Sequence, residues 1–357
     1  MSETDPAAPY TIAVYNHKGG VGKTTASLNL SVCLAAAGFR CLLIDLDPQQ
    51  SSTTILARSG VSPNLVDVLR KTAVIDEAAH QTPVENLWII PSTRSLTLLE
   101  SGLDERIRPN QGLRTLLSFS ERRFDFIVID CPPAMGLLSI NALVAADSVV
   151  VPTTSSAFSL QGVHRTAETV TALRSGIAPW LSVLGIMITL FEGSQRDRQV
   201  VGELTSGFPG QVFRTRIRFD PEVQKAEGKR QPACIFNPMA LGTRDYAQLT
   251  TEIVGRLHRL RKIGDGSDFA FDQMVSRIEG NLTRPDFARL GEAGPPADAT
   301  DQTGTDPDES GDQPQPQKPR RAIAGIAVGF LVGFLCGGAV GLLAGPQALA
   351  VLSAALG

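Results

Sequence analysis

The 357-residue sequence lacks most of the features that mark secreted, disulfide-stabilised or metal-binding proteins. Its five cysteines form no C-x-x-C pair and no spacing typical of a metal site. Most of them lie among apolar neighbours, where a free cysteine behaves as a small hydrophobic residue, so we expect a reducing compartment. The N-terminal MSETDPAAPY is acidic and has no apolar run typical of a secretory signal. The body of the protein is therefore expected in the cytoplasm.

A strong net charge is also absent, because the formal value is only -3. The distribution of charge is uneven. Residues 263–321 hold 12 acidic and 6 basic side chains, which leaves residues 1–262 with 27 basic and 24 acidic ones. A mildly basic body permits binding to a polyanion but does not require it. Nothing after Arg321 is charged.

Apolar runs alternate with helical patterns along the first 262 residues. Near-continuous apolar runs suit the strands of a parallel sheet that is buried on both faces. The runs are YTIAVYN, RCLLIDLD, NLWIIP, FDFIVIDCPP, DSVVVPT and LGIMITLF. The stretches between them are long enough for crossover helices, at 51–82, 136–146, 160–175 and 195–206. The pattern predicts one doubly wound, mostly parallel α/β domain over residues 8–262, with its ligand site at the carboxyl ends of the strands.

The chain after this domain changes composition twice. Residues 263–290 predict a short helical extension, which either packs back on the domain or binds a partner. Its apolar face would consist of Phe271, Met274, Val275, Ile278 and Leu282. Residues 291–320 are rich in Pro, Asp, Gly, Gln and Thr and offer almost nothing to bury. They are predicted to be a disordered acidic linker.

A glycine-rich turn, NHKGGVGKTT at residues 16–25, stands between the first strand and the first helix. The standard phosphate-loop pattern fails, because His17 occupies the position of its first glycine. The chemistry survives, since backbone N–H groups at a helix N-terminus bind phosphate and Lys23 can reach the outer phosphates. A Thr24 hydroxyl can ligate Mg²⁺. The predicted phosphate contacts are Lys18, Gly19, Gly20, Val21, Gly22, Lys23, Thr24 and Thr25.

These residues resemble the deviant Walker A motif of the ParA/MinD/Soj family of ATPases. Two further segments of that family recur in order, LLIDLDPQQSST and the Walker B-like FIVIDCPPAMGLLSINAL. The resemblance continues through VPTTSSAFSLQGV and VFRTRI to FNPMALGTRDYAQL, over roughly residues 10–260, and is closest to the partition ATPases of the ParA/Soj type. It implies a P-loop NTPase fold with ATP and Mg²⁺ as cofactors.

The resemblance also implies catalytic roles. Lys18 would cross the interface of an ATP-bound homodimer and contact the partner's nucleotide, which makes hydrolysis depend on dimerisation. Lys23 would neutralise charge on the phosphates. Asp47 would orient the attacking water, and its alternative role is that of a helix cap or loop residue.

Other residues would bind the cofactors. The resemblance places Thr24, Asp45 and Asp130 around Mg²⁺, although Asp45 too could serve only as a helix cap or in a loop. By the same resemblance, the adenine would lie near Asn237 and Pro238.

Basic residues in the C-terminal third hold DNA non-specifically in this family, through phosphate contacts. The sequence supplies Arg196, Arg198, Arg214, Arg216, Arg218, Lys225, Lys229 and Arg230. It departs from the family where arginines are expected, with Gly193 in one segment and Phe219 and Glu222 in another. Non-specific DNA binding and a merely solvated basic face are both left open.

The C-terminal stretch 322–345 is uncharged and mostly apolar. As a helix it would reach about 35 Å, enough to cross a hydrocarbon core of about 30 Å. Arg320 and Arg321 precede it, which predicts a single-pass anchor entering from the cytoplasmic face of the inner (plasma) membrane. A buried core helix is the alternative. Glycine at every fourth position, from 325 to 345, predicts helix–helix packing, and residues 346–357 form an apolar tail.

The sequence thus predicts a membrane-tethered ATPase that resembles ParA. It would position or partition a cellular cargo by ATP-dependent dimerisation and by slow hydrolysis that a partner protein stimulates. One alternative is a DNA-partitioning ATPase that bridges nucleoid and membrane. Another is a non-enzymatic membrane scaffold stabilised by nucleotide, which Lys18 and Asp47 disfavour because a scaffold does not need them.

Overall fold

The computed structural model describes residues 8–57, 60–100, 112–156, 159–260, 262–263 and 270–288. Its strands are β1 Tyr10–Val14, β2 Cys41–Asp45, β3 His80–Gln81, β4 Leu87–Ile90, β5 Phe126–Asp130, β6 Ser148–Thr154, β7 Ser182–Phe191 and β8 Val212–Arg218. The helices up to β6 are α1 Lys23–Ala36, α2 Ser51–Leu56, α3 Leu65–Leu69, α4 Ile75–Ala78, α5 Leu96–Glu100, α6 Leu113–Leu117 and α7 Leu137–Ala145. Those that follow are α8 Ser159–Arg174, α9 Gln195–Gly207, α10 Pro221–Gly228, α11 Ala233–Phe236, α12 Leu241–Arg259 and α13 Phe271–Leu282.

The strands form one eight-stranded sheet in the order β3-β4-β2-β5-β1-β6-β7-β8. Every pairing is parallel except that of β3 with β4. The predicted doubly wound, mostly parallel α/β fold is therefore confirmed. The two-residue antiparallel strand β3 was not predicted, because His80 and Gln81 have no apolar pattern.

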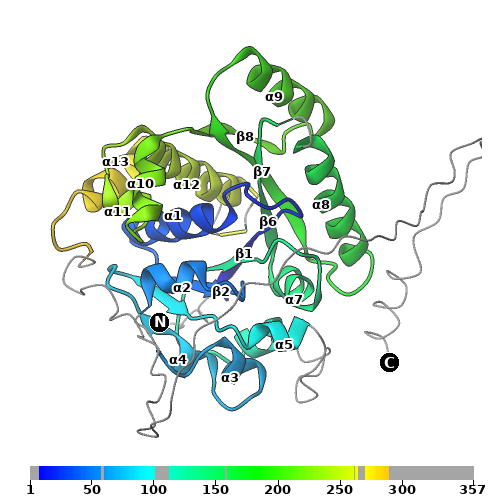
Figure 1. Cartoon of the computed structure of the whole chain (residues 1–357), viewed down its shortest axis with the longest axis vertical. Coiled ribbons are helices and arrows are strands. Elements are labelled where there is room, and N and C mark those ends of the chain that lie inside the picture. The colour runs from blue at the N-terminus through cyan, green and yellow to red at the C-terminus, as the bar shows by residue number, and fades with distance from the viewer. Residues whose placement is uncertain are drawn as a thin grey trace, which may run out of the picture. The chain divides into compact units, whose positions relative to one another are not determined.

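Helices cover both faces of the sheet, as Figure 1 shows for α1 and α12 on one side and α7 and α8 on the other. The central strands β1, β2 and β5 are buried at every position, since both of their faces pack against apolar helices. One core joins the sheet to α1, α12 and α13, and the other joins it to α3 and α6 to α9. This arrangement explains why the strand sequences are continuous apolar runs and do not alternate.

Helix α1 runs from the carboxyl edge of the sheet back to the amino edge. Its N-cap, Gly22, has a φ of 78°, a left-handed conformation that glycine adopts at little cost. Gly38, with a φ of 93°, follows its C-terminus and turns the chain into β2. The two glycines therefore fix where α1 starts and stops.

Residues 270–288, here called the C-terminal strap, pack onto the domain. Met274, Ile278 and Leu282 of α13 are buried, while Phe271 stays 41% exposed. The Asn281 side-chain amide donates to the carbonyl of Ala36, at the end of α1, over 2.7 Å.

The last residues of the strap join the sheet at its amino edge, just before β4. Phe287 is buried, and its carbonyl accepts from the amide of Glu85 at 2.9 Å. Ala288 forms an antiparallel bridge with Val84. The strap thus ends at the edge of the sheet opposite to the carboxyl ends of the strands.

No helix in the described part of the chain is long and apolar enough to cross a membrane. The predicted linker at 291–320, the predicted span at 322–345 and the tail at 346–357 all lie outside the described residues. Those predictions stay predictions.

Candidate functional site

The glycine-rich turn connects the end of β1 to the start of α1. Gly20 and Gly22 both have a positive φ, 69° and 78°, and the positions of Gly19 and Gly20 have open space where a side chain would begin. No side chain caps the N-terminus of α1. The free N–H groups of that helix end and of the glycine turn suit an anionic ligand such as phosphate.

Lys23, the first residue of α1, is only 7% exposed. Its ammonium donates to the carbonyl of Lys18 at 3.2 Å. Burial lowers the pKa of Lys23, and the neighbouring carboxylates of Asp130 and Asp47 oppose that shift. The lysine therefore places a desolvated positive charge between the phosphate loop and two acidic residues.

Lys18 is bonded within its own chain. Its backbone N–H donates to the side-chain oxygen of Asn16 at 3.0 Å, and the Asn16 amide donates to the carbonyl of Pro152 at 2.8 Å. The Lys18 ammonium donates to the hydroxyl of Ser156 at 2.5 Å. The side chain thus lies along the loop that follows β6.

Two carboxylates, Asp45 and Asp130, end the neighbouring strands β2 and β5 and lie opposite each other in register. Both are fully buried. The hydroxyls of Ser27 and Ser52 donate to the two oxygens of Asp130 at 3.0 and 2.7 Å, and the nearby Thr24 hydroxyl, like these two, acts to lower the pKa of Asp130. Asp130 therefore connects the start of α1, the start of α2 and β5.

Asp45 is held differently, by the segment that follows it in the sequence. One of its oxygens accepts from the backbone N–H and the hydroxyl of Thr53 at 2.8 and 2.7 Å. The other accepts from the backbone N–H of Asp47 at 3.1 Å. Asp45 thus shapes the loop that carries Asp47, and it also lies beside Asp130.

Burial raises the pKa of Asp45 to about 7 and that of Asp130 to about 6. For Asp45 the nearby charge of Asp130 adds to the shift, because two adjacent carboxylates resist being ionised together. A cation placed between the carboxylates would relieve that repulsion.

Asp47 is half-buried and its carboxylate accepts from the backbone N–H of Gln49 at 2.9 Å. Its carbonyl accepts from the hydroxyl of Ser92, in the loop after β4, at 2.6 Å. The N–H of Ser92 in turn donates to Thr53 at 2.8 Å. Ser92 therefore fixes the Asp47 loop from a distant segment, and no local pattern around Ser92 predicted this.

The structure brings together Lys18, Lys23, Thr24, Asp45, Asp47 and Asp130 at the carboxyl ends of β1, β2 and β5. Asn237 and Pro238, the predicted adenine contacts, lie between α11 and α12, and that role stays a prediction. The Asn237 amide donates to Glu222 at 3.0 Å. Helix α11 packs on α1, where the thiols of Cys234 and Cys33 are 3.4 Å apart.

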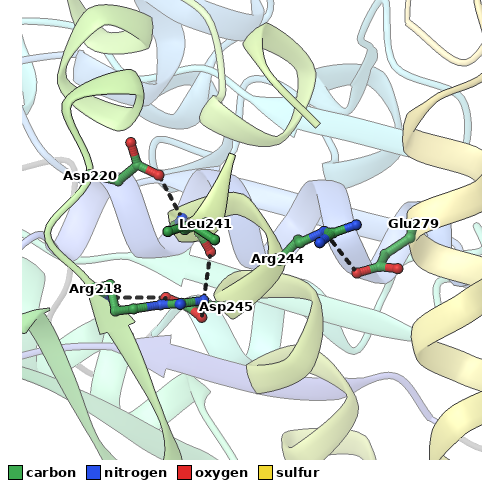
Figure 2. Close-up of polar contacts among 7 residues, drawn as sticks. Arg218, Asp220, Leu241, Arg244, Asp245 and Glu279 are labelled. Atoms are coloured by element: carbon green, nitrogen blue, oxygen red, sulfur yellow. Dashed lines mark hydrogen bonds and ion pairs between the residues drawn. The ribbon is translucent and has the colours of Figure 1, made fainter. Parts of the chain in front are cut away.

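Arg218, at the end of β8, forms a two-pronged ion pair with Asp245 of α12 (Figure 2). Its Nε and Nη2 donate to the two carboxylate oxygens at 2.8 and 2.6 Å. Asp220 accepts from the N–H of Gly242 at 2.9 Å, which also ties the turn before α10 to the start of α12. Both Arg218 and Arg216 are exposed, but Arg218 is ion-paired, whereas the Arg216 guanidinium lies 5.1 Å from the ring centre of Phe191.

No group of three or more His, Cys, Asp or Glu side chains that could hold a metal ion by themselves is found among the described residues. The oxygen donors Thr24, Asp45 and Asp130 nevertheless suit Mg²⁺, which prefers one or two carboxylates together with water and phosphate oxygens. The donor set fits an ion that arrives with a nucleotide.

Comparison with known proteins gives relatives for most of the chain. A family model described as "AAA domain" matches residues 10–183. The sporulation initiation inhibitor protein Soj of Bacillus subtilis is 35% identical over 245 residues, 68% of this chain and 97% of Soj. The chromosome partitioning protein ParA of Myxococcus xanthus is 33% identical and covers 69% of this chain and 88% of its own length.

A solved structure has a similar fold. It is the cobyrinic acid a,c-diamide synthase of Mycobacterium smegmatis with bound ATP analogue and magnesium, with a TM-score of 0.58 and 25% identity. The match covers 71% of this chain and 96% of the synthase.

The carboxylate pair predicts a pH dependence of stability in buffer without divalent cations. Free aspartate has a pKa of about 3.9 in the unfolded chain, so between about pH 4 and 7 the folded protein binds more protons than the unfolded one. The free energy of unfolding should therefore fall as the pH rises through this window. Urea denaturation between pH 5 and 7.5 measures it. Asp130→Asn should flatten the slope, and the exposed Asp272→Asn should not; parallel curves for Asp130→Asn and wild type would contradict the assignment.

Proposed function

Since the chain belongs to the ParA/Soj family of P-loop ATPases, we propose that it is an ATP hydrolase with a deviant Walker A loop that positions a cellular cargo. ATP with Mg²⁺ would pair two chains, and slow hydrolysis, stimulated by a partner protein, would separate them. The observation that carries the proposal is the convergence of Lys23, Asp47 and Asp130 beside the glycine turn at the N-terminus of α1.

Different residues of this chain would bind the phosphates, neutralise their charge and hold the metal. When bound, ATP with Mg²⁺ supplies the transferable phosphoryl group and the divalent charge that neutralises the phosphate oxygens. The N–H groups from Gly19 to Thr25 would bind the phosphates, and Lys23 would add a positive charge in a desolvated setting. Thr24 and Asp130, which lie near each other, would hold the metal.

Asp47 would orient the attacking water. Asp45 and Ser92 hold the backbone of the loop that carries Asp47. One carboxylate oxygen of Asp47 accepts a hydrogen bond from the backbone N–H of Gln49. Asp45 is buried and bonded to Thr53, so we assign it to shaping this loop and supporting the metal shell.

Asp47→Ala should leave ATP binding within about threefold of wild type and lower the hydrolysis rate by about 100-fold or more, because water positioning acts in the reaction and not in binding. ATP affinity and phosphate release by the full-length chain measure the two effects. Lys23→Ala, the comparison variant, should lose ATP binding itself. Asp76→Ala, a substitution of the same kind outside the site, should change neither. Normal hydrolysis by Asp47→Ala would show that the role belongs to another residue.

Membrane attachment is proposed from the charge-free stretch at 322–345 and the preceding Arg320 and Arg321. A single-pass anchor would hold the protein at the cytoplasmic face of the inner membrane in both nucleotide states. The ATP cycle would then change pairing and partners while attachment stays constant.

A chain ending at Pro319 tests the anchor. Fluorescent fusions of the full-length and shortened chains should show a membrane signal for the first and a diffuse signal for the second. Lys23→Ala in the full-length chain should stay at the membrane, since attachment would not need nucleotide. Identical distributions of the full-length and shortened chains would contradict membrane attachment through this stretch.

A second candidate function, the bridging of nucleoid and membrane, is favoured by exposed arginines on neighbouring elements. Arg214 and Arg216 lie on the edge strand β8, and Arg196 and Arg198 lie at the start of α9. Lys225 is paired with Glu222 at 2.7 Å, and Arg218 is committed to Asp245, so these two cations contribute less.

DNA binding by this face should depend steeply on salt. Four phosphate contacts would lower the affinity about 100-fold between 50 and 200 mM salt, because each contact releases counterions. Binding of the full-length chain with ATP to random-sequence duplex DNA measures the slope. Arg214→Ala with Arg216→Ala should flatten it, whereas removal of two charges at Lys71 and Arg123 should not. No binding at 50 mM salt would eliminate this second function.

A further inference from the structure

We propose that Ser156 is a positioning residue that holds the Lys18 side chain inside its own subunit. We also propose that the loop Thr154–Ser156 couples the position of Lys18 to the conformation of the start of α9. The inference rests on the proposed function, in which Lys18 acts on a second chain. The three parts are called here the serine latch: Lys18, Thr154–Ser156 and Asp197.

The Lys18 side chain reaches Ser156 because the residues beside Lys18 and those of α8 that face it allow a close approach. Asn16 fixes the Lys18 N–H and is itself tied to the end of β6 through Pro152. Gly162, in α8, leaves room for this approach: a side chain there would begin 3.2 Å from the Asn16 oxygen and 3.7 Å from the Lys18 Cβ. The Lys18 ammonium then meets the Ser156 hydroxyl at 2.5 Å.

The Ser156 hydroxyl belongs to a chain of hydroxyls. It lies 3.0 Å from the hydroxyl of Ser159, which is fully buried at the start of α8. Ser159 lies in turn 3.3 Å from the hydroxyl of Thr154, at the end of β6. A lysine that leaves this cluster removes its only cationic donor among these contacts, so the hydroxyls must rearrange.

The neighbouring residue, Ser155, connects the same loop to α9. Its hydroxyl donates to one carboxylate oxygen of Asp197. The other oxygen of Asp197 accepts from the N–H groups of Glu192 and Ser194 at 3.1 and 3.0 Å. Ser194 caps α9, since its hydroxyl accepts from the Asp197 N–H at 3.1 Å.

The same loop therefore bonds to Lys18 through Ser156 and to the first turn of α9 through Ser155. The ammonium of Lys18 cannot donate to Ser156 and reach a second chain at the same time. The contact inside the chain and the contact across chains compete, and pairing must first break the former. Breaking it loosens the loop that supports Asp197, which lies between the exposed Arg196 and Arg198. Pairing and the presentation of this basic turn would thus be coupled.

Ser156→Ala in the full-length chain tests the latch. Without its partner, Lys18 is free to pair, and two latches are broken per dimer. The concentration of chain needed for half-maximal ATP-dependent dimerisation should fall about 100-fold, as the loss of one hydrogen bond to a charged group in each of the two chains implies. Ser156→Thr keeps the hydroxyl and should restore the wild-type value. Ser175→Ala, at an exposed serine beyond the far end of α8, is the control.

Two further readouts separate the latch from a merely structural role of Ser156. In a Lys18→Ala background, Ser156→Ala should no longer change dimerisation, because there is no lysine left to release. Backbone amides of residues 192–198 should exchange with solvent faster in Ser156→Ala than in wild type before ATP is added.

Different results of these experiments would overturn the latch and the proposed function. Unchanged dimerisation by Ser156→Ala while wild type dimerises with ATP would overturn the latch and leave the proposed function standing. So would an effect of Ser156→Ala that persists without Lys18, and unchanged exchange at residues 192–198 would overturn the coupling to α9. A wild-type chain that never pairs with ATP would instead overturn the proposed function, and the latch with it.

Discussion

The site depends on one constraint, the burial of two carboxylates at the adjacent ends of β2 and β5. Asp130 and Asp45 have no exposure to solvent, so each needs hydrogen-bond donors from the protein. Asp130 takes them from α1 and α2, and Asp45 takes them from Thr53 of α2 and from Asp47 in the loop that follows β2. Satisfying the two acids therefore fixes the start of the first helix, the following loop and the central strands in one geometry. The desolvated charge of Lys23 belongs to the same arrangement.

The sequence was sufficient for the parts of this protein that depend on local pattern. Central strands are buried on both faces, so they appear as continuous apolar runs, and the glycine turn shows directly where a phosphate could be bound. Contacts between segments that are distant in the sequence could not be predicted from it. Ser92 meets Asp47 across 45 positions of sequence, and Ser156 meets Lys18 across 138. Serine occurs in many places for many reasons, so only the folded chain shows which hydroxyls matter.

The fate of the arginines in the C-terminal third illustrates the same limit. By composition, Arg216 and Arg218 are equivalent candidates for a basic surface. In the fold, Arg218 is ion-paired with Asp245 of α12, while the Arg216 guanidinium lies over an aromatic ring. Charge that looks available in a sequence can thus be a structural tie, and the difference is set by a partner 27 residues away.

The C-terminal strap gives α1 a second attachment. The helix begins at Lys23 and ends at Ala36, where Asn281 bonds to its last turn. Its 14 residues span about 21 Å, from the glycine turn to the contact with Asn281 of the strap. Mechanical tension on the chain beyond Ala288 would be borne first by the bridge to Val84 and by Phe287. That load would enter at the edge of the sheet opposite to the glycine turn, so the candidate site lies away from the point at which the chain would be pulled.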